Sequence, residues 1–411
     1  MLSVDDAVAM VAGAFRPLPP EQIGLGTALG RVLAEDVAAR VSQPPVAVSA
    51  MDGYALATGG ATGGATGGHG ARTATFRVVG EAMAGKGFAG TLGRGEAVRI
   101  ATGAPIPAGA DAIVIQEEAQ RDGDRITALT TIQPGRWIRA AGLDFAAGQV
   151  LLSAGRTLTA RDIGLLAAMN VPWLRVRRKP RVAVLATGDE LVMPGESPAP
   201  DQIVAANSVA IAACVAVFGG DTIDLGIAAD TPEALAERMA GSRGSDLMVT
   251  IGGASVGDRD LIARMLGAEG LALGFHKVAM RPGKPLIFGT LGDLPVLGLP
   301  GNPVSAGVTA LLFLKPAVDA MLGRTEAEPA TTARLGRDLD ANDNRQDYLR
   351  ATLSRGPDGD FLATPFDRQD SAMLSGFAAA DCLVVRPPGA AAAGAGDRVP
   401  VLLFPPGLAG F

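Results

Sequence analysis

The chain has 411 residues, of which 48% are hydrophobic and 19% charged, with a formal net charge of −6. This composition supplies apolar mass for several folded domains and excludes a mostly disordered chain. The acidic balance, without a basic stripe interleaved with aromatic residues, argues against nucleic-acid binding. No apolar run reaches the length of ~20 residues that a membrane helix needs, and the N-terminal segment is acidic where a signal peptide is basic. We therefore expect a cytoplasmic protein without a membrane segment.

The first 178 residues predict two domains, one inserted into the other. Ser3 followed by acids and helically spaced apolar residues predicts an amphipathic helix from about residue 4 to 15 that packs on a neighbour or a second subunit. Short β-like runs between Gly, Pro and Asp turns predict a β-rich inserted domain at 43–145. Around it, residues 1–42 and 146–178 form a discontinuous N-terminal helical linker domain, in which Thr159 and Asp162 make a capping-box pattern.

An imperfect Gly/Thr/Ala repeat at residues 57–74 has nothing to bury and much backbone entropy to lose, which predicts a surface loop rather than a phosphate cradle. The nearby GEAMAGKG at 80–87 is no phosphate loop either, because Gly87 stands where Ser or Thr must bind the metal. No G-x-G-x-x-G motif follows a predicted strand either.

Histidine and cysteine chemistry is not indicated. The two histidines lie in unrelated contexts, so neither a catalytic triad nor a zinc site can be assembled from them. Cys214 and Cys382 stand alone in apolar surroundings and are expected to be inert core residues. Catalysis is therefore expected to run on oxyanion binding, a metal ion and carboxylates.

From residue 179 the pattern changes to apolar strands alternating with amphipathic helices. This alternation over 179–326 predicts a mostly parallel, doubly wound sheet covered on both faces. After it, the polar and turn-rich segment 327–411 contains short strands and predicts a small C-terminal β domain. The fold class is therefore a multidomain α/β and β protein.

Acids and glycines follow successive predicted strands of the α/β domain. In open α/β sheets ligands bind beyond the carboxyl ends of the strands, so these residues form one candidate site. They are Glu190 after 181–187, Asp230 after 221–227, Gly252, Gly253, Ser255, Gly257, Asp258 and Asp260 after 246–251, and Pro300, Gly301, Asn302 and Pro303 after 295–299.

Each type of residue suits an anionic ligand with a metal ion. Glycines let backbone amides approach an anion. Carboxylates beside such a cradle make sense if Mg²⁺ bridges them to a phosphate, and Asp260, Asp230 and Glu190 are the candidate metal ligands. Lys277, Arg281 and Lys284 add three cations, and an extended 277–281 would place the first two on one face.

Each feature also has a plain structural explanation. The glycines could only form a tight turn, Asp258 could be an ordinary N-cap, and the basic run could be a solvated face. Taken singly, each alternative has about even odds. The joint occurrence of these glycines, acids and cations after successive strands favours a functional site.

Six segments carry a resemblance to a known family: SAMDGYA (49–55), EAVRIATGAPIPAGADAIV (96–114), VAVLATGDELV (182–192), GGASVGDRD (252–260), RPGKPLIFG (281–289) and GLPGNPVSA (298–306). In this order, over nearly the whole chain, they resemble the molybdopterin molybdenumtransferases, which are related to the gephyrin E domain.

The resemblance implies an elongated, four-part subunit with a C-terminal β-barrel-like domain, which forms a homodimer. Its active site would be completed by the partner subunit. Molybdate would be inserted into adenylylated molybdopterin with release of AMP and with Mg²⁺ as metal. Molybdopterin adenylyltransferase and acceptor molybdoenzymes would be further partners. Motif matching adds Asp52 and Thr102 to the catalytic residues and, more weakly, Ser371 and Arg350 to the cofactor-binding residues.

The chain departs from the family pattern at several positions. Arg281 replaces the usual Lys, which exchanges a compact ammonium for a planar guanidinium. Leu143, Ala205 and Ala206 stand where the family commonly shows Glu and Asp-Ser, so two carboxylates on the active-site side are absent. These losses leave open a second hypothesis, a divergent non-catalytic paralogue that binds or delivers molybdopterin or the cofactor to a molybdoenzyme. A third is adenylylation of molybdopterin, against which the N- and C-terminal additions argue.

Overall fold

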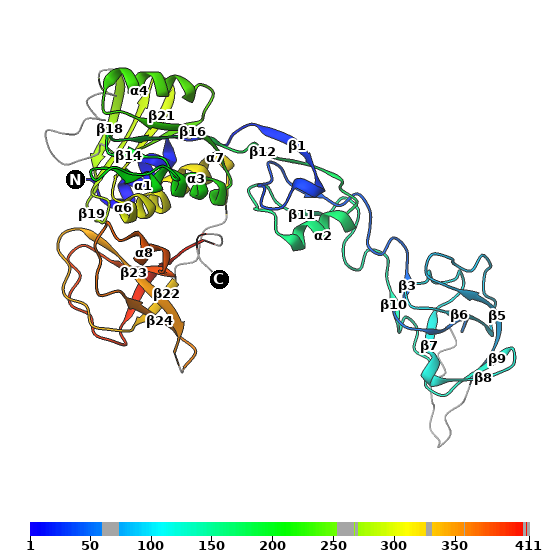
Figure 1. Ribbon diagram of the computed structural model, residues 1–411. Helices are drawn as coiled ribbons and strands as arrows, with labels where there is room; N and C mark the ends of the chain where they lie inside the picture. Colours follow the sequence, from blue (N-terminus) through cyan, green and yellow to red (C-terminus); the bar gives the residue numbers. More distant parts are fainter. Residues whose placement is uncertain are drawn as a thin grey trace.

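A computed structural model of the chain describes residues 1–59, 74–252, 267, 270–325, 331–356, 358–405 and 408. In these residues the chain forms an elongated molecule with parts of different architecture (Figure 1). An α/β domain and a β-barrel lie at one end, a small β-rich domain lies in the middle, and a β domain lies at the far end (Figure 1). The expected elongated, multidomain α/β and β architecture is confirmed.

The α/β domain is built on a six-stranded sheet with the order β16-β13-β17-β21-β20-β18. Strands β16, β13, β17 and β21 run parallel, whereas β20 runs antiparallel to both of its neighbours. The mostly parallel sheet that the alternating pattern predicts is therefore present, with an antiparallel hairpin at one side. The strands are β13 (Arg181–Thr187), β16 (Asp221–Ala228), β17 (Leu247–Ile251), β18 (Leu271–Lys277), β20 (Pro285–Leu291) and β21 (Leu294–Leu299).

Helices cover both faces of this sheet, as expected. Helix α4 (Pro232–Met239) packs Leu235 and Met239 on one face, and its start is capped by the Thr231 side chain. The other face carries α1 (Val4–Gly13), α3 (Ala206–Phe218), α6 (Pro303–Thr309), the π-helical turn η4 (Ala310–Leu314) and α7 (Lys315–Leu322).

Residues Pro303–Leu322 form one helical run of 20 residues that is long and apolar enough to cross a membrane, which the sequence analysis did not anticipate. However, 67% of its most apolar window is buried inside the molecule. Its apolar side chains pack against the sheet and α1, so this run is a core helix of the α/β domain.

Helix α1 begins after the Ser3 cap, as the sequence predicts. It does not belong to the N-terminal domain, however, because Val4, Ala7 and Val11 are buried in the core of the α/β domain. The apolar face that the periodicity revealed is therefore covered within the same subunit.

The N-terminal domain is β-rich rather than helical, which corrects the expected helical linker domain. Two antiparallel ribbons and a single helix surround a core that includes Leu33, Phe145 and Leu166. Thr159 and Asp162 form the expected capping box at the helix start. The elements are β1 (Pro20–Gly24) with β12 (Trp173–Arg177), β2 (Val37–Ala38) with β11 (Val150–Leu152), the short η1 (Leu25–Thr27) and α2 (Ala160–Ala168).

The inserted domain is a six-stranded sheet with the order β7-β4-β6-β5-β9-β8. A short ribbon of β3 (Val48–Ser49) and β10 (Ile138–Arg139) leads into it. The strands of the sheet are β4 (Gly53–Leu56), β5 (Thr75–Ala82), β6 (Glu96–Ile100), β7 (Ala112–Ile115), β8 (Ala119–Asp122) and β9 (Arg125–Ala128), with the turn η2 (Gln116–Glu118) between β7 and β8. Most of the Gly/Thr/Ala repeat lies outside the described residues.

The C-terminal domain is a five-stranded barrel, because β23 pairs with both β24 and β25 and so closes the order β23-β24-β22-β26-β25. Both cysteines are buried and free, Cys382 in this barrel and Cys214 in α3. The elements are β22 (Thr331–Leu335), β23 (Gln346–Arg355), β24 (Phe361–Pro365), α8 (Leu374–Ala378), β25 (Cys382–Arg386) and β26 (Arg398–Leu403), and β19 (Met280–Arg281) of the preceding segment joins β23.

Candidate functional site

Three loops meet at the carboxyl edge of the α/β sheet, where β13, β17 and β21 end. A Cβ on Gly252 would lie 2.5 Å from the carbonyl oxygen of Thr187, and a Cβ on Gly301 would lie 3.6 Å from Cα of Gly252. Gly252 also has φ +104°, a conformation that favours glycine. Backbone rather than side chains therefore forms the floor of this edge.

Among the residues that the structure describes, the buried hydroxyl of Thr187 at the end of β13 has no hydrogen-bond partner, and the same holds for Thr250 near the end of β17. A buried hydroxyl without a partner is costly in a folded protein. The sequence analysis did not single out either threonine, because its signals were acids, bases and glycines.

Three carboxylates gather beside this floor. The backbone N–H of Asp230 donates to Oδ1 of Asp189 at 3.0 Å, which brings the loops after β13 and β16 together. Partial desolvation and the negative charges of Asp189 and Glu190 raise the pKa of Asp230. The predicted acids Glu190 and Asp230 are thus neighbours, and Asp189 is a third member that sequence reasoning had not proposed as a metal ligand.

These carboxylates fit a magnesium ion as a partial ligand set. Within the described part of the chain, no group of three His, Cys, Asp or Glu side chains is arranged to enclose a metal ion. Mg²⁺ needs no such enclosure, because it commonly takes one or two carboxylates and completes its shell with water and phosphate oxygens. Partial burial and then the charges of Asp189 and Glu190 raise the pKa of Asp230, and a bound cation would favour its ionised form. Asp260, the third predicted metal ligand, lies outside the described residues.

The three predicted cations do not act as one group in this subunit. Strand β18 ends at Lys277, and Arg281 belongs to β19, which pairs with the barrel strand β23. The segment 277–281 is thus divided between two strands, and the condition under which Lys277 and Arg281 would share one face is not met. The guanidinium of Arg281 is ion-paired with Asp347 and lies 3.7 Å from a carboxylate oxygen of Asp343.

Lys277 and Lys284 remain available, since their ammonium groups make no hydrogen bond or ion pair with any other residue the structure describes. Both side chains are half-buried and lie at adjoining ends of β18 and β20. Between them, Gly283 has φ +104°, and a Cβ there would lie 2.6 Å from Cγ2 of Thr309. The loop that carries Lys284 is therefore packed against α6.

The barrel docks on the same edge through Ser371. Its hydroxyl accepts a hydrogen bond from the side-chain amide of Asn302 at 2.9 Å, and its carbonyl accepts the N–H of Val304 at 3.0 Å. On the other side, the side-chain amide of Asn207 donates to the Gly301 carbonyl at 2.6 Å. The segment from Pro300 to Pro303 is thus held between α3 and the barrel, with Pro300 buried and Pro303 in the first turn of α6.

Arg350 supports the loop that carries Ser371. Its side chain is 1% exposed, and its guanidinium donates to the carbonyls of Arg368, Asp370 and Met373 at 3.0–3.1 Å. These bonds fold the loop that presents Ser371. The structure therefore places the buried Arg350 against the backbone of this loop.

Asp52 and Thr102 form a second cluster, in the inserted domain. Oδ1 of Asp52 accepts the backbone N–H of Thr102 at 2.6 Å and its hydroxyl at 2.8 Å. The backbone hydrogen bond, followed by the hydroxyl bond, lowers the pKa of Asp52, with a smaller contribution from Arg99. The residue after Asp52 is Gly53, and a Cβ at this position would overlap the Val114 carbonyl of the neighbouring strand.

The two clusters do not meet within one subunit. The inserted domain lies at the opposite end of the elongated molecule from the α/β domain, with the N-terminal domain between them (Figure 1). Of the predicted residues at the α/β edge, Gly253, Ser255, Gly257, Asp258 and Asp260 lie outside the described residues.

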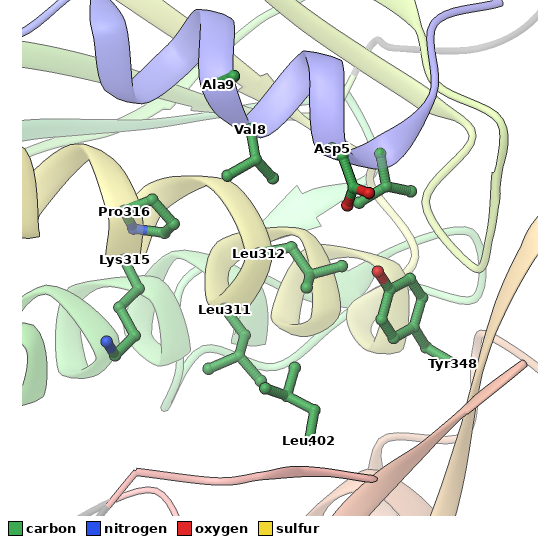
Figure 2. A pocket seen from close by; sticks show the side chains of 10 residues that line it. Asp5, Val8, Ala9, Leu311, Leu312, Lys315, Pro316, Tyr348 and Leu402 are labelled. Atoms are coloured by element: carbon green, nitrogen blue, oxygen red, sulfur yellow. The ribbon is translucent and has the colours of Figure 1, made fainter. Parts of the chain in front are cut away.

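An apolar pocket of about 430 Å³ lies elsewhere, between α1, the helical run at 311–316 and the barrel. Figure 2 shows Val8, Leu311 and Leu312 lining it, with Asp5 and Tyr348 at one end and Lys315 at the other. Burial raises the pKa of the Tyr348 hydroxyl. None of the predicted site residues lines this pocket, so its size alone does not make it the functional site.

Comparison with known proteins settles the family. Residues 2–170 match the family described as MoeA N-terminal region (domain I and II), residues 183–320 match a probable molybdopterin binding domain, and residues 332–404 match the MoeA C-terminal region (domain IV). A molybdopterin molybdenumtransferase of Nostoc sp. is 36% identical over 86% of this chain and 82% of its own length. The chain belongs to the molybdopterin molybdenumtransferase family.

Other members of this transferase family agree over the full length. The molybdopterin molybdenumtransferase of Haemophilus influenzae is 33% identical over 94% of both chains. The crystal structure of a molybdopterin biosynthesis MoeA protein from Pyrococcus horikoshii superposes with a TM-score of 0.84 at 31% identity, covering 100% of both chains. The domain order is thus that of a molybdenumtransferase fold, and both clusters described above lie within this fold.

Proposed function

We propose that this protein inserts molybdenum from molybdate into adenylylated molybdopterin and releases AMP, as a cytoplasmic enzyme of molybdenum cofactor biosynthesis. The observation that carries the proposal is the edge of the α/β sheet. There the closely approaching backbone of Thr187, Gly252 and Gly301 lies beside the carboxylates of Asp189, Glu190 and Asp230. Family membership supports the same activity.

The residues at this edge have distinct tasks in the proposal. Backbone amides near Gly252 and Gly301 would receive phosphate oxygens, because glycine allows the main chain to approach an anion closely. Lys277 and Lys284 would hold molybdate or phosphate oxygens as negative charge shifts to the leaving AMP. Ser371 and Asn302 would fix the wall of the pocket through their mutual hydrogen bond.

Magnesium fits as the metal, with Glu190 and Asp230 as ligands and Asp260 as the third predicted ligand. Bound there, Mg²⁺ supplies neutralisation of phosphoanhydride charge and polarisation of the bond to AMP. Asp189 contributes by positioning the loop of Asp230 through its backbone hydrogen bond.

The proposal includes a homodimer whose active site takes residues from both subunits. The inserted domain, which carries Asp52 and Thr102, lies at the far end of the molecule from the α/β domain of its own subunit (Figure 1). A two-fold dimer would bring the inserted domain of one copy to the α/β domain of the other. Molybdopterin adenylyltransferase and acceptor molybdoenzymes would be transient partners before and after the reaction.

The direct test is AMP release. Purified protein incubated with adenylylated molybdopterin, Mg²⁺ and molybdate is expected to release AMP stoichiometrically with the formation of molybdenum cofactor. Omission of molybdate or chelation of Mg²⁺ should each prevent it. Tight binding of the substrate without AMP release would instead indicate the non-catalytic carrier.

The shared site has its own test. Protein carrying Asp52→Asn and protein carrying Gly252→Ala are each expected to keep about 1% of the wild-type activity or less. The two proteins are then unfolded together and refolded as a mixture. In mixed dimers one of the two sites receives an intact inserted domain and an intact α/β edge, so roughly a quarter of the wild-type activity should return. Absence of any recovery, with mixed dimers demonstrated by mass, would contradict a site shared between subunits.

A further inference from the structure

A polar pocket of about 340 Å³ lies in the inserted domain beside Asp52. Its volume falls in the ~300–1,000 Å³ range typical of small-molecule sites. The residues that line it are Asp52, Gly53, Tyr54, Glu81, Met83, Arg99, Ile100, Ala101, Gln116 and Arg121. Beyond Asp52, none of its charged side chains belongs to the site deduced above.

The pocket arises from the register of the sheet. Tyr54 on β4 is paired with Arg99 on β6, which is paired with Glu81 on β5. Residues paired across neighbouring strands project to the same face, so these three side chains form one row. Tyr54 and Ala97 belong to the apolar core on this face, and Arg99 and Glu81 therefore lie at the point where that core ends.

The charged groups of the pocket retain unused hydrogen-bonding capacity. Arg99 and Glu81 are 3.8 Å apart with side chains 56% and 51% exposed, and such a loose exposed pair contributes little stability. Both hydrogen bonds from Thr102 are accepted by Oδ1 of Asp52, which leaves Oδ2 as an acceptor. Arg121 donates from Nε to the Gly123 carbonyl, which leaves its terminal guanidinium nitrogens as donors. Carboxylate acceptors and guanidinium donors therefore face the same space.

This balance selects against a small oxyanion. Two carboxylates and two guanidinium groups give the pocket no net charge, so a dianion such as molybdate or phosphate would meet repulsion from Asp52 and Glu81. A neutral planar heterocycle with donors and acceptors along one edge would satisfy both kinds of group. Met83 and Tyr54 supply apolar surface for the faces of such a ring.

We infer that this pocket binds the pterin ring of the substrate through its 2-amino-4-oxo edge, with Glu81 and Asp52 accepting from the ring N–H and amino groups and Arg99 donating to the ring carbonyl. The inference rests on the proposed function, because that function supplies a pterin. It assigns the inserted domain to recognition of the ring and leaves the phosphate end of the substrate to the α/β edge.

The experiment uses 6-hydroxymethylpterin, a phosphate-free pterin whose own fluorescence reports binding to the full-length protein. The variants are Arg99→Met and Glu81→Gln, whose exposed side chains contribute little to folding. Arg77→Met is the matched control, because Arg77 pairs with Glu96 at 2.7 Å across the same two strands but outside the pocket. Guanosine, which carries the same edge, and adenosine and molybdate, which do not, are the competing ligands.

Wild type and Arg77→Met should bind the pterin equally, and each pocket variant should weaken binding by about tenfold or more, because a charged hydrogen-bond partner is lost. Unchanged binding in Arg99→Met, or preferential displacement by adenosine or molybdate, would overturn the inference. Tighter binding of guanosine than of the pterin would overturn the assignment to a pterin.

AMP release measured on the same proteins separates the two proposals. If wild type binds the pterin through Arg99 but releases no AMP, the pocket stands and the proposed function fails. If wild type releases AMP while Arg99→Met binds the pterin normally, only the pocket assignment fails.

Discussion

The edge of the α/β sheet and the pocket of the inserted domain are built in different ways. At the α/β edge, main-chain atoms of three strand ends approach each other closely, and glycine is needed where Gly252 lies against Thr187. In the inserted domain, side chains from one row across β4, β6 and β5 line a space between strands. The floor of the α/β edge is therefore made of backbone, whereas the pocket of the inserted domain is made mainly of side chains.

This difference predicts different responses to substitution. A backbone site tolerates no added atom, since the main chain itself must shift, whereas a side-chain site loses one interaction at a time. Substitutions at the α/β edge should therefore be nearly all-or-none. Those in the inserted domain should be graded.

The largest effect is expected for Gly252→Ala. The new Cβ would lie 2.5 Å from the Thr187 carbonyl oxygen in a backbone at φ +104°, so we expect AMP release to fall by at least ~100-fold and the stability of the domain by roughly 2–4 kcal/mol. Activity assays and urea unfolding measure the two effects.

The control for this prediction is Gly244→Ala, which shares a positive φ of +81° but has no atom within 4 Å of the added Cβ. It should cost about 1 kcal/mol of stability and leave activity unchanged. If both variants behave alike, backbone strain rather than the close approach explains the loss, and the contrast between the two regions fails.

An effect on activity alone, without the loss of stability, is expected for Asp52→Asn. Asparagine keeps an oxygen that can accept both bonds from Thr102, so the loop should persist, but the charge is lost; kcat/KM should fall by about 100-fold. Thr102→Val keeps the backbone bond and should cost about tenfold. Equal, complete inactivation by both would show that this region is also all-or-none.

The pH dependence of Asp52 follows from the same bonds. They lower its pKa, so its carboxylate stays ionised throughout the neutral range, and any stability it adds is present above the unfolded pKa and lost as pH falls through the folded one. Above about pH 5, the activity of wild type should therefore show no titration step that is due to Asp52. The pH profiles of wild type and Asp52→Asn should then have the same shape in this range. A pH–rate profile of both proteins measures this.

The smallest effect is expected for the thermal stability of Asp230→Asn, measured in the absence of metal. The pKa of Asp230 is raised, so its contribution to stability is present below the unfolded pKa and lost as pH rises through the folded pKa. At pH 7 the variant should melt slightly higher than wild type, by no more than about 1 °C because the side chain is exposed. Near pH 3 the difference should vanish.

Magnesium sharpens this last test. Added Mg²⁺ should stabilise wild type and not Asp230→Asn, which would reverse their order at pH 7. Equal stabilisation of both proteins by Mg²⁺ would argue against Asp230 as a ligand.

Local features of the sequence were sufficient for much of the fold. The alternation of apolar strands and amphipathic helices predicted the sheet and its covered faces, because burial on both sides requires that pattern. Thr159 and Asp162 predicted the start of α2 because a capping box needs only neighbouring residues. Among the described residues, Glu190 after β13, Asp230 after β16, Gly252 after β17 and Gly301 after β21 lie at one edge, because parallel strands end on the same side.

Contacts between distant segments could not be predicted from the sequence. The periodicity of α1 showed an apolar face but not that α7 would cover it. Arg281 was predicted as one of three cations for an anionic ligand, and the structure pairs it with Asp347 from the barrel. Arg350 matched a ligand-binding position, and the structure uses it to fold the Ser371 loop.

By itself, then, the amino-acid sequence determined the elements, the parallel sheet and the residue types that gather at its edge, because propensity, periodicity and capping act over a few neighbouring residues. Only the tertiary structure decided which charges are neutralised, that Asp52 lies far from the α/β edge of its own subunit, and that Arg99 stands beside Glu81. Those outcomes depend on strand register and domain placement, which join residues far apart in the chain.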